Sequence, residues 1–524
     1  MYKRAQHQKN LNKTEIFDII VIGGGATGLG VALDATTRGY KTLLVEAHDF
    51  AKGTSSRSTK LVHGGVRYLA QGDIALVFEA LNERGIMAKN AKHLVDKQAF
   101  LIPNYSTINN YYYATGLKVY DWMSRSLSLG KTKSYDKKRT LDKLPYLKKD
   151  KLNSSVVYYD AQFDDARFAI NLAQTAVENN AVLLNYTKVT ALTKNKKDKI
   201  NGVIIKNQLS GETKTIKSKV VVNATGIFID SILDMDQKTD EKTIVTSQGV
   251  HLVVKNDFIN SKHALMIPKT TDDRVLFAVP WHNKLIIGTT DTPTDQPEIE
   301  PKALAEEIDF IINTFNFYVE KQISKKDVLS VFAGLRPLSK PKDNQKKSKE
   351  ISRGHKINLS ASGLITISGG KWTTYRKIAE DTINKIIRAH KLEDAECVTS
   401  TLALHGNMSH KSLDKTNPRS FYGVDLKHIE LLEQENLKLS EKLHPDYPHT
   451  MAQVYWAMNY EFAQTVEDIL ARRIRLLFLD ARAAIEAAPK VATFMMTEKN
   501  ESQHWRLEQI SHFTRLAKNY LISE

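Results

Sequence analysis

A glycine cluster between two apolar runs places the strongest constraint on how this 524-residue chain can fold. Residues 17–22 read FDIIVI, a run rich in β-branched side chains that predicts a buried parallel strand. Gly23, Gly25 and Gly28 follow with the spacing G-x-G-x-x-G. Gly23 permits a tight turn, Gly25 leaves room for a pyrophosphate, and Gly28 lets a helix lie close to the strand. The spacing therefore indicates a dinucleotide-binding βαβ unit.

The residues after the glycines complete this pattern. An alanine-rich helix is expected to start near Ala26 and Thr27, where its unpaired N–H groups would meet the phosphates. Residues 41–45 predict a second strand, and Glu46 ends it 18 residues past Gly28. A carboxylate there can bridge the two ribose hydroxyls of an adenosine. The glycines alone fit NAD and FAD equally well.

Composition and charge narrow the class of protein. The chain is 42% hydrophobic, which supports globular domains, and its length suggests roughly two to four of them. Cys397 is the single cysteine, which excludes an internal disulfide, a cysteine-based zinc site and an iron–sulfur cluster, and we expect no metal site. The formal charge of +16 favours an anionic partner, either lipid headgroups or a phosphorylated substrate. Nucleic acid is disfavoured because no motif for it is visible, and a solvated basic surface without a partner is the alternative.

The sequence predicts neither a signal peptide nor a membrane-spanning segment. Residues 1–13 carry basic side chains but have no apolar stretch of their own behind them. Residues 18–35 are the most apolar stretch, but glycines interrupt it and a strand and a helix already explain it. We therefore expect a soluble or peripheral protein.

A second segment with functional side chains follows Glu46, and it reads HDFAKGTSSRSTKLVHGGVRYL over residues 48–69. Its hydroxyl and backbone N–H groups can cradle a pyrophosphate, and its paired glycines let the backbone press against a flat ring. His63 is either a structural imidazole or part of a site. Arg67, four residues further on, favours the site.

Several motifs, in order along the chain, resemble one family. GGGATGLG and TSSRSTKLVHGGVRYL are similar to segments of the flavin-dependent glycerol-3-phosphate dehydrogenases, which are membrane-associated respiratory enzymes, and of their oxidase relatives. The resemblance continues in DDARF (164–168), VVNATG (221–226), GVHLVV (249–254), IIGTTDT (286–292), AGLRPL (333–338), SGGKWTTYRKIAED (368–381) and DARAAIEAAP (480–489). It implies an enzyme that uses FAD and oxidises sn-glycerol 3-phosphate to dihydroxyacetone phosphate.

The resemblance also implies which residues contact FAD. They lie in the glycine loop, in the hydroxyl-rich segment at residues 54–65, at the ends of later strands and at a second helix start that follows glycines. The set is Gly23, Gly25, Ala26, Thr27, Gly28, Glu46, Thr54, Ser55, Ser56, Lys60, Leu61, His63, Gly64, Gly65, Val189, Ala224, Gly226, Gly370, Lys371 and Thr373. Residues 187–190 would run alongside the adenine of FAD. The helix start after Gly370 suits the electron-rich end of a reduced flavin.

Catalytic and substrate-binding roles follow from the same resemblance. Arg336 and Arg67 would hold the substrate phosphate, because guanidinium pairs with phosphate in a bidentate way. His251 is the first choice to take the proton of the C2 hydroxyl, His63 is the alternative, and Lys371 would stabilise charge at the substrate or the flavin. The catalytic set is His251, His63, Arg336, Lys371 and Arg67; the substrate-binding set is Arg67, Tyr68, His251, Arg336 and Lys371.

The predicted fold is α/β, with a Rossmann-type FAD-binding domain of the glutathione-reductase kind, an interleaved antiparallel-sheet substrate domain and a C-terminal all-α domain. Buried runs at 181–186 and 219–223 predict further strands of the first domain. Alternation through 243–292 indicates antiparallel strands with a turn at His282 and Asn283. The FAD-binding domain is expected over 15–75, 155–235 and 350–390, the substrate domain over 76–154 and 236–349, and the helical domain, as a cap without a catalytic role, over 400–524.

Five local predictions concern helices and loops. Residues 76–99 have helical spacing, and the lysine-rich residues 131–153 are expected to form a surface excursion. Asp164 and Asp165 should open a helix that runs to about residue 179, because acids in a first turn favour the helix dipole. Apolar residues from 462 to 477 fall close to one helical face. Pro489 is expected to stop a helix over 480–488.

The electron acceptor has two candidates within the family. Residues 337–349 form a short basic loop and lack the long insertion of the oxidase relatives. This favours a dehydrogenase that passes electrons to a membrane quinone over an oxidase that reduces O2 to H2O2. A more distant alternative is a flavoprotein that modifies RNA, and AGLRPL with GGKWTTYR argues against it. We expect peripheral attachment to the anionic cytoplasmic face of the membrane, and we consider a homodimer.

Overall fold

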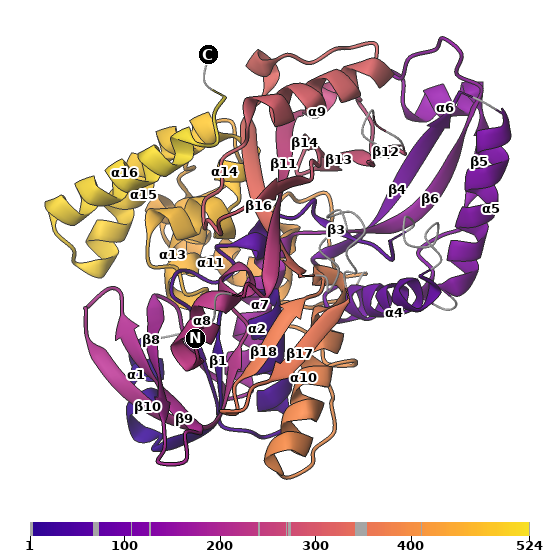
Figure 1. Cartoon of the computed structure of the whole chain (residues 1–524). Helices are drawn as coiled ribbons and strands as arrows, with labels where there is room; N and C mark the ends of the chain where they lie inside the picture. The colour runs from indigo at the N-terminus through magenta and orange to yellow at the C-terminus, as the bar shows by residue number, and fades with distance from the viewer. Residues whose placement is uncertain are drawn as a thin grey trace.

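Two sheets and a C-terminal group of helices make up the computed structural model (Figure 1). It describes residues 4–65, 73–105, 107–124, 127–238, 241–268, 270, 274–340, 354–409 and 411–522. In Figure 1 the first sheet lies below the second, and the yellow C-terminal helices lie to the left of the second sheet. The predicted α/β class with an antiparallel second sheet and a helical C-terminal domain is confirmed.

The first sheet is built around the strand that leads into the glycine cluster. Its strand order is β17-β18-β10-β1-β2-β7, and β8 and β9 continue from β10. The strands from β18 to β7 run parallel, and β17, β8 and β9 are antiparallel additions. The bounds are β1 (Ile16–Ile22), β2 (Thr42–Val45), β7 (Val182–Leu184), β8 (Thr187–Lys194), β9 (Ile200–Asn207), β10 (Thr213–Asn223), β17 (His355–Leu359) and β18 (Ile365–Gly369).

Glycines let helix α2 (Ala26–Thr37) approach β1 closely. Gly23 makes the turn with φ +109°, a conformation that favours glycine. A Cβ at Gly28 would lie 1.9 Å from the Gly23 carbonyl oxygen, so no side chain fits there. The roles predicted for Gly23 and Gly28 are therefore confirmed. Helices α7 (Asp165–Glu178) and α10 (Tyr375–His390) pack against α2.

The second sheet has ten strands in the order β15-β11-β14-β13-β12-β4-β6-β3, with β16 on β11 and β5 on β6. The pairs are antiparallel except β12 with β4. His282 (φ 46°) and Asn283 (φ 60°) form the predicted two-residue turn between β13 and β14. The bounds are β3 (Leu61–Val62), β4 (Val95–Asn104), β5 (Lys133–Asp136), β6 (Ser154–Phe163), β11 (Ile244–Lys255), β12 (Ala264–Ile267), β13 (Leu276–Trp281), β14 (Lys284–Gly288), β15 (Thr292–Thr294) and β16 (Ser330–Ser339).

Two local predictions about this half were wrong in part. The helix predicted over 76–99 is α4 (Ile74–Asn90), and the chain then turns into β4, which pairs along its length with β6. The segment 131–153 is largely exposed, but it also contains β5 and α6 (Lys137–Lys143). Local periodicity misses such strands because their pairing partners lie far along the chain. Helices α5 (Thr107–Met123) and α9 (Ala305–Tyr318) cover this sheet (Figure 1).

The C-terminal region is helical, as predicted, but two of its details differ. Helix α15 (Ala481–Lys499) continues through Pro489 instead of ending there, because buried residues on both sides of the proline, such as Ala484 and Val491, hold it in the core. The segment 462–477 is not one helix: it contains a π-helical turn, and Arg475 (φ 68°) breaks it. Among the described residues, the other α-helices are α1 (Arg4–Lys13), α8 (Ile229–Asp236), α11 (Leu426–Glu435), α12 (Leu437–Ser440), α13 (Met451–Tyr460), α14 (Leu476–Leu479) and α16 (Gln503–Lys518).

Helix α7 opens at Asp164 and Asp165 as predicted, and it anchors the C-terminal region. The Asp164 carboxylate accepts a hydrogen bond from the backbone N–H of Arg167 and so caps the helix. The Arg167 guanidinium pairs with both oxygens of Glu461 at 2.7 Å, and neither side chain is exposed. Arg475 lies 3.0 Å from Asp165. The C-terminal helices therefore pack on the first sheet's helices as well as on β16.

His405 forms another contact between α7 and the C-terminal region. Its ring nitrogens lie 2.5 Å from a Glu178 oxygen and 2.8 Å from an Asp425 oxygen. Burial alone would lower the pKa of His405, but the two carboxylates outweigh it and raise the pKa to about 9.

The placement of His405 between Glu178 and Asp425, here called the clamp, predicts a loss of stability at alkaline pH. Because the pKa of His405 is raised on folding, its ion pairs stabilise the fold fully below pH 6.5. This stabilisation disappears as the pH rises through about 9. The difference in the free energy of unfolding amounts to about 3.5 kcal/mol, since one pKa unit is ~1.4 kcal/mol. The melting temperature of His405→Gln should therefore change less than that of the wild type between those pH values. His504→Gln, at an exposed site, is the control and should keep the wild-type slope; equal slopes for all three proteins would contradict the role of the clamp.

Candidate active site

The end of β2 and the glycine loop are joined through Glu46. The Glu46 carboxylate accepts hydrogen bonds from the backbone N–H groups of Gly24 (2.7 Å) and His48 (2.8 Å). Gly25 is the N-cap of α2, and the next N–H group, of Ala26, donates to the Ser55 hydroxyl at 2.9 Å. Sequence motifs predicted that the glycine loop, Glu46 and the hydroxyl-rich segment belong to one site. The structure brings them together at one end of the first sheet.

The hydroxyl-rich segment, residues 54–65, connects the two sheets. Its Thr54 hydroxyl donates to the Leu335 carbonyl of β16 at 2.6 Å. The Trp372 indole N–H donates to the Ser55 carbonyl at 2.8 Å, which connects the segment to the helix start after Gly370. The strand ends and this segment bring together most of the predicted cofactor residues, including Ala224, which lies against Gly23.

Glycines hollow one face of the second sheet beside that segment. In the β11–β16 register, His251 pairs with Phe332, and Ser247 pairs with Arg336. His251 and Arg336 lie on the same face, since side chains two and four residues apart along a strand share a face. A Cβ at Gly288 would lie 2.4 Å from the His251 ring, and one at Gly249 would lie 2.4 Å from the Arg336 guanidinium. The glycines thus make room for both functional side chains.

His251 is buried and held on both sides. Its ring stacks on Phe332 at 4.8 Å between centroids, and its Nε2 atom lies 2.9 Å from the Thr59 hydroxyl. Its Nδ1 atom has no hydrogen-bond partner within the described part of the chain. Burial, with Lys60 and Arg336 as lesser causes, holds the pKa of His251 well below its usual range. The imidazole is therefore neutral, which is the form that can accept a proton.

Arg336 is fixed before any ligand arrives. Its guanidinium donates to the Asp291 carboxylate and the Thr289 hydroxyl, both at 3.2 Å, and to the Thr290 carbonyl at 3.0 Å. Its side chain keeps 21% of its surface exposed. A rigid, partly exposed guanidinium suits a phosphate dianion.

Other predicted site residues have different surroundings. Gly369 (φ 75°) and Gly370 (φ 90°) bend the chain so that Lys371 precedes the short helix η7 (Trp372–Thr374), and Thr373 donates to the His63 carbonyl at 3.4 Å. Val189 is buried in β8, Leu61 is buried in β3, and Gly64 and Gly65 follow that strand. Arg67 and Tyr68 lie outside the described residues.

Lys60 has a role that its sequence position did not reveal. Its ammonium lies 2.6 Å from both the Asp165 carboxylate and the Ser56 carbonyl, and it is fully buried. Burial lowers the pKa of Lys60 to about 7, and Asp165 opposes the shift. The ammonium is thus taken up inside the protein, and the backbone N–H and carbonyl of Lys60 are bonded to the Ser58 hydroxyl and the Phe163 N–H, both at 3.0 Å. The cofactor contact predicted for Lys60 stays a prediction. Sequence reasoning also missed Thr59 as a partner of His251.

Comparison with known proteins decides the family. The chain matches the model "FAD dependent oxidoreductase" over residues 18–376 and the model "C-terminal domain of alpha-glycerophosphate oxidase" over residues 365–506. It is 38% identical to a probable mitochondrial glycerol-3-phosphate dehydrogenase of Caenorhabditis elegans, over 96% of this chain and 74% of that protein. It is 39% identical to the mitochondrial glycerol-3-phosphate dehydrogenase of Homo sapiens, over 95% of this chain and 73% of that protein.

A solved structure agrees with these relatives. The glycerol-3-phosphate dehydrogenase of Bacillus halodurans complexed with FAD superposes with a TM-score of 0.82 and 30% identity, and the match covers 100% of this chain and 99% of that one. The chain belongs to the FAD-dependent glycerol-3-phosphate dehydrogenase family. The L-alpha-glycerophosphate oxidase of Mycoplasma pneumoniae, with a TM-score of 0.57 and 18% identity, shares the fold.

The site of this dehydrogenase-family protein fits FAD. The first N–H groups of α2 lie at the glycine loop, where a pyrophosphate can bind, and Glu46 is fixed at the position for an adenosine ribose. Gly226 (φ 60°) faces open space, because a Cβ there would meet no atom within 4 Å. FAD as the cofactor is confirmed at the level of the family, and the residues that contact it stay a prediction.

Gly25 gives a direct test of the pyrophosphate site. A Cβ at this residue would already lie 3.0 Å from the Ser55 hydroxyl, so Gly25→Val should fill the space that the cofactor needs. The variant should fold but carry little or no FAD, measured as flavin absorbance per protein after purification. Gly116→Val, where a Cβ meets nothing within 4 Å, is the control and should keep its FAD. Normal flavin content in Gly25→Val would refute the assignment.

Proposed function

We propose that this protein oxidises sn-glycerol 3-phosphate at C2 to dihydroxyacetone phosphate and passes the electrons to a membrane quinone. The observation that carries the proposal is the placement of His251 and Arg336 on one glycine-hollowed face that the FAD-binding segment 54–65 joins to the first sheet. A neutral base and a fixed cation are what a hydroxyl group next to a phosphate ester requires. When bound, FAD supplies the acceptor for the C2 hydride.

Arg336 and His251 have different roles in this proposed reaction. Arg336 holds the phosphate and so orients C2, and Arg67 is the predicted second cation. The neutral imidazole of His251 takes the hydroxyl proton as the C2 hydrogen leaves with its electron pair. Thr59 and Phe332 hold the ring, so the base in this scheme is the buried Nδ1 atom, which has no hydrogen-bond partner among the described residues. His63, the alternative base, contributes its carbonyl to Thr373.

Arg336→Leu should weaken recognition of the phosphate. Loss of a charge-assisted pair of roughly 2 to 4 kcal/mol should lower kcat/KM for glycerol 3-phosphate on the order of a hundredfold. Glycerol, which lacks the phosphate, should be a poor substrate of both proteins. Arg388→Leu, an exposed arginine of α10, is the control and should retain the wild-type kcat/KM. Unchanged steady-state parameters in Arg336→Leu would show that the phosphate binds elsewhere.

The electron acceptor separates the proposed dehydrogenase from an oxidase. The absence of the oxidase-type insertion after residue 337 supports the quinone. We predict that enzyme reduced anaerobically by glycerol 3-phosphate is reoxidised at the turnover rate by a soluble quinone analogue and slowly by air-saturated buffer. Stopped-flow absorbance of the flavin measures both rates. Rapid, stoichiometric peroxide formation would instead identify an oxidase.

Membrane attachment is the second part of the proposal, and we place it at the cytoplasmic face. No helix in the described ranges is long and apolar enough to cross a bilayer. Helices α4 and α5 pack together through a small buried cluster, and their outer faces carry exposed apolar side chains: Ile74, Phe78, Val119 and Trp122. Trp122 is 79% exposed, and such a residue, together with the +16 charge, suits an anionic membrane surface.

Vesicle binding tests this attachment. Binding to anionic vesicles should weaken from low to high salt, because attraction to the surface is screened within about 10 Å at 0.1 M salt. Trp122→Gln should bind more weakly than the wild type in a co-sedimentation assay. Leu507→Gln, an exposed position on α16, is the matched control and should bind normally. Absence of wild-type binding, or equal losses in the two variants, would contradict the proposed surface.

A further inference from the structure

A cluster of buried charges joins the C-terminal helices to the segment that carries Glu46. The Asp49 carboxylate has no exposed surface and accepts hydrogen bonds from two consecutive arginines. Arg472 Nε and Arg473 Nη1 lie 2.5 and 2.7 Å from Asp49 Oδ2, and Arg473 Nη2 lies 2.8 Å from Oδ1. Asn185 also donates to Oδ1, at 3.2 Å. These four donors fix the Asp49 carboxylate in place.

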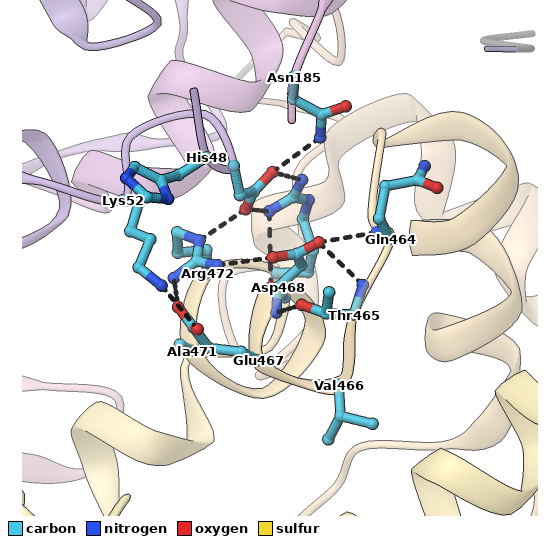
Figure 2. A network of polar contacts seen from close by, with 12 residues as sticks. His48, Lys52, Asn185, Gln464, Thr465, Val466, Glu467, Asp468, Ala471 and Arg472 are labelled. Atoms are coloured by element: carbon cyan, nitrogen blue, oxygen red, sulfur yellow. Dashed lines mark hydrogen bonds and ion pairs between the residues drawn. The ribbon is translucent and has the colours of Figure 1, made fainter. Parts of the chain in front are cut away.

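The cluster is closed around Arg472, as Figure 2 shows. Arg472 donates to Glu467 at 2.6 Å and to Asp468 at 2.7 Å. Lys52, from the FAD-binding half, reaches Glu467 at 2.8 Å. Three carboxylates therefore face three cations, which compensates the cost of burying them. The Asp468 carboxylate also accepts hydrogen bonds from the backbone N–H groups of Gln464 and Thr465.

The same segment forms one wall of the FAD site. Glu46 lies three residues before Asp49, and its carboxylate bonds to the N–H groups of Gly24 and His48. The Ala51 N–H donates to the Gly24 carbonyl at 2.9 Å. Residues 46–51 thus contact the glycine loop on one side and the C-terminal arginines on the other.

The next strand end is held by the same cluster. The Tyr186 N–H donates to the His48 carbonyl at 2.8 Å, and its phenol donates to Asp468 at 2.6 Å. The Thr187 N–H donates to the Glu46 carbonyl at 2.7 Å. Both backbone segments around the predicted adenosine site therefore depend on contacts with the C-terminal helices.

We infer that Asp49, held by Arg472 and Arg473, is a positioning residue for FAD. It fixes residues 46–51 so that Glu46 and Gly24 are in place before the cofactor binds, which lowers the ordering cost of binding. The C-terminal region, expected only as a cap, would thus complete the cofactor site. The inference rests on the FAD site described above and is independent of the substrate and of the electron acceptor.

The test compares three variants on the full chain: Asp49→Asn, Glu46→Gln and the double variant. The FAD dissociation constant is measured from the recovery of flavin fluorescence as the holoenzyme is diluted. Asp49→Asn keeps the shape of the side chain but removes its charge, and it should raise the dissociation constant about tenfold. If Asp49 acts through Glu46, the same change in the Glu46→Gln background should have a much smaller effect.

Glu461→Gln is the matched control. It makes the same carboxylate-to-amide change in another buried ion pair, with Arg167, between the C-terminal region and the FAD-binding half. The change leaves in place the Glu461 backbone carbonyl, which accepts a hydrogen bond from Arg473 Nε at 2.8 Å. Glu461→Gln should lower the melting temperature yet leave the FAD dissociation constant within about twofold of the wild type. A merely structural role of Asp49 would give equal FAD losses in both variants.

The outcomes separate clearly. An unchanged dissociation constant in Asp49→Asn, additive effects with Glu46→Gln, or an equal loss in Glu461→Gln would overturn the inference. If Asp49→Asn does not fold, Arg473→Lys, which keeps the charge but loses the bidentate fork, takes its place under the same criteria. Wild-type protein that binds no FAD would contradict the cofactor site itself, and wild-type binding with additive variants would contradict only the role of Asp49.

Discussion

The hydrogen bonds that residues 54–65 make to the second sheet and to the short helix η7 after β18 are the interactions on which the active site depends. The Thr54 hydroxyl bonds to β16, the Thr59 hydroxyl bonds to the His251 ring, and the Ser55 carbonyl receives the indole of Trp372. Without these bonds the dinucleotide site on the first sheet and the histidine and arginine on the second would not share one space. The first sheet provides the dinucleotide site, and the second sheet provides a surface for a phosphate. Residues 54–65 bring the two together into one site for oxidation.

Buried charge holds the third part of the molecule against the first. Arginines 167, 472, 473 and 475 are almost wholly buried, and each is paired with a carboxylate. A buried ion pair adds little net stability, because desolvation opposes the attraction between the charges. Loss of one partner is costly, however, so such pairs define a single docking geometry. That geometry fixes both the helix α7 and the turn after Glu46, which are parts of the cofactor half.

Local features of the sequence were sufficient to predict much of the fold. The strand, glycines and helix of residues 16–37, the turn at His282 and Asn283, and the helix that starts at Asp164 all rest on interactions between near neighbours. Where tertiary contacts decide, the predictions failed: β4 is a strand because β6 lies beside it, and α15 continues through Pro489 because its alanine-rich face is buried. The bond from Thr59 to His251 joins residues 192 positions apart, and no spacing rule could show it.

The central claim is that this active site removes a hydride from C2 of glycerol 3-phosphate and transfers it to bound FAD. The most direct measurement is anaerobic stopped-flow absorbance of the oxidised holoenzyme mixed with glycerol 3-phosphate, once with hydrogen and once with deuterium at C2. We predict that the flavin absorbance bleaches at a rate at least equal to turnover, and that deuterium slows it. A flavin that stays oxidised, or one that is reduced at the same rate with both isotopes, would contradict it.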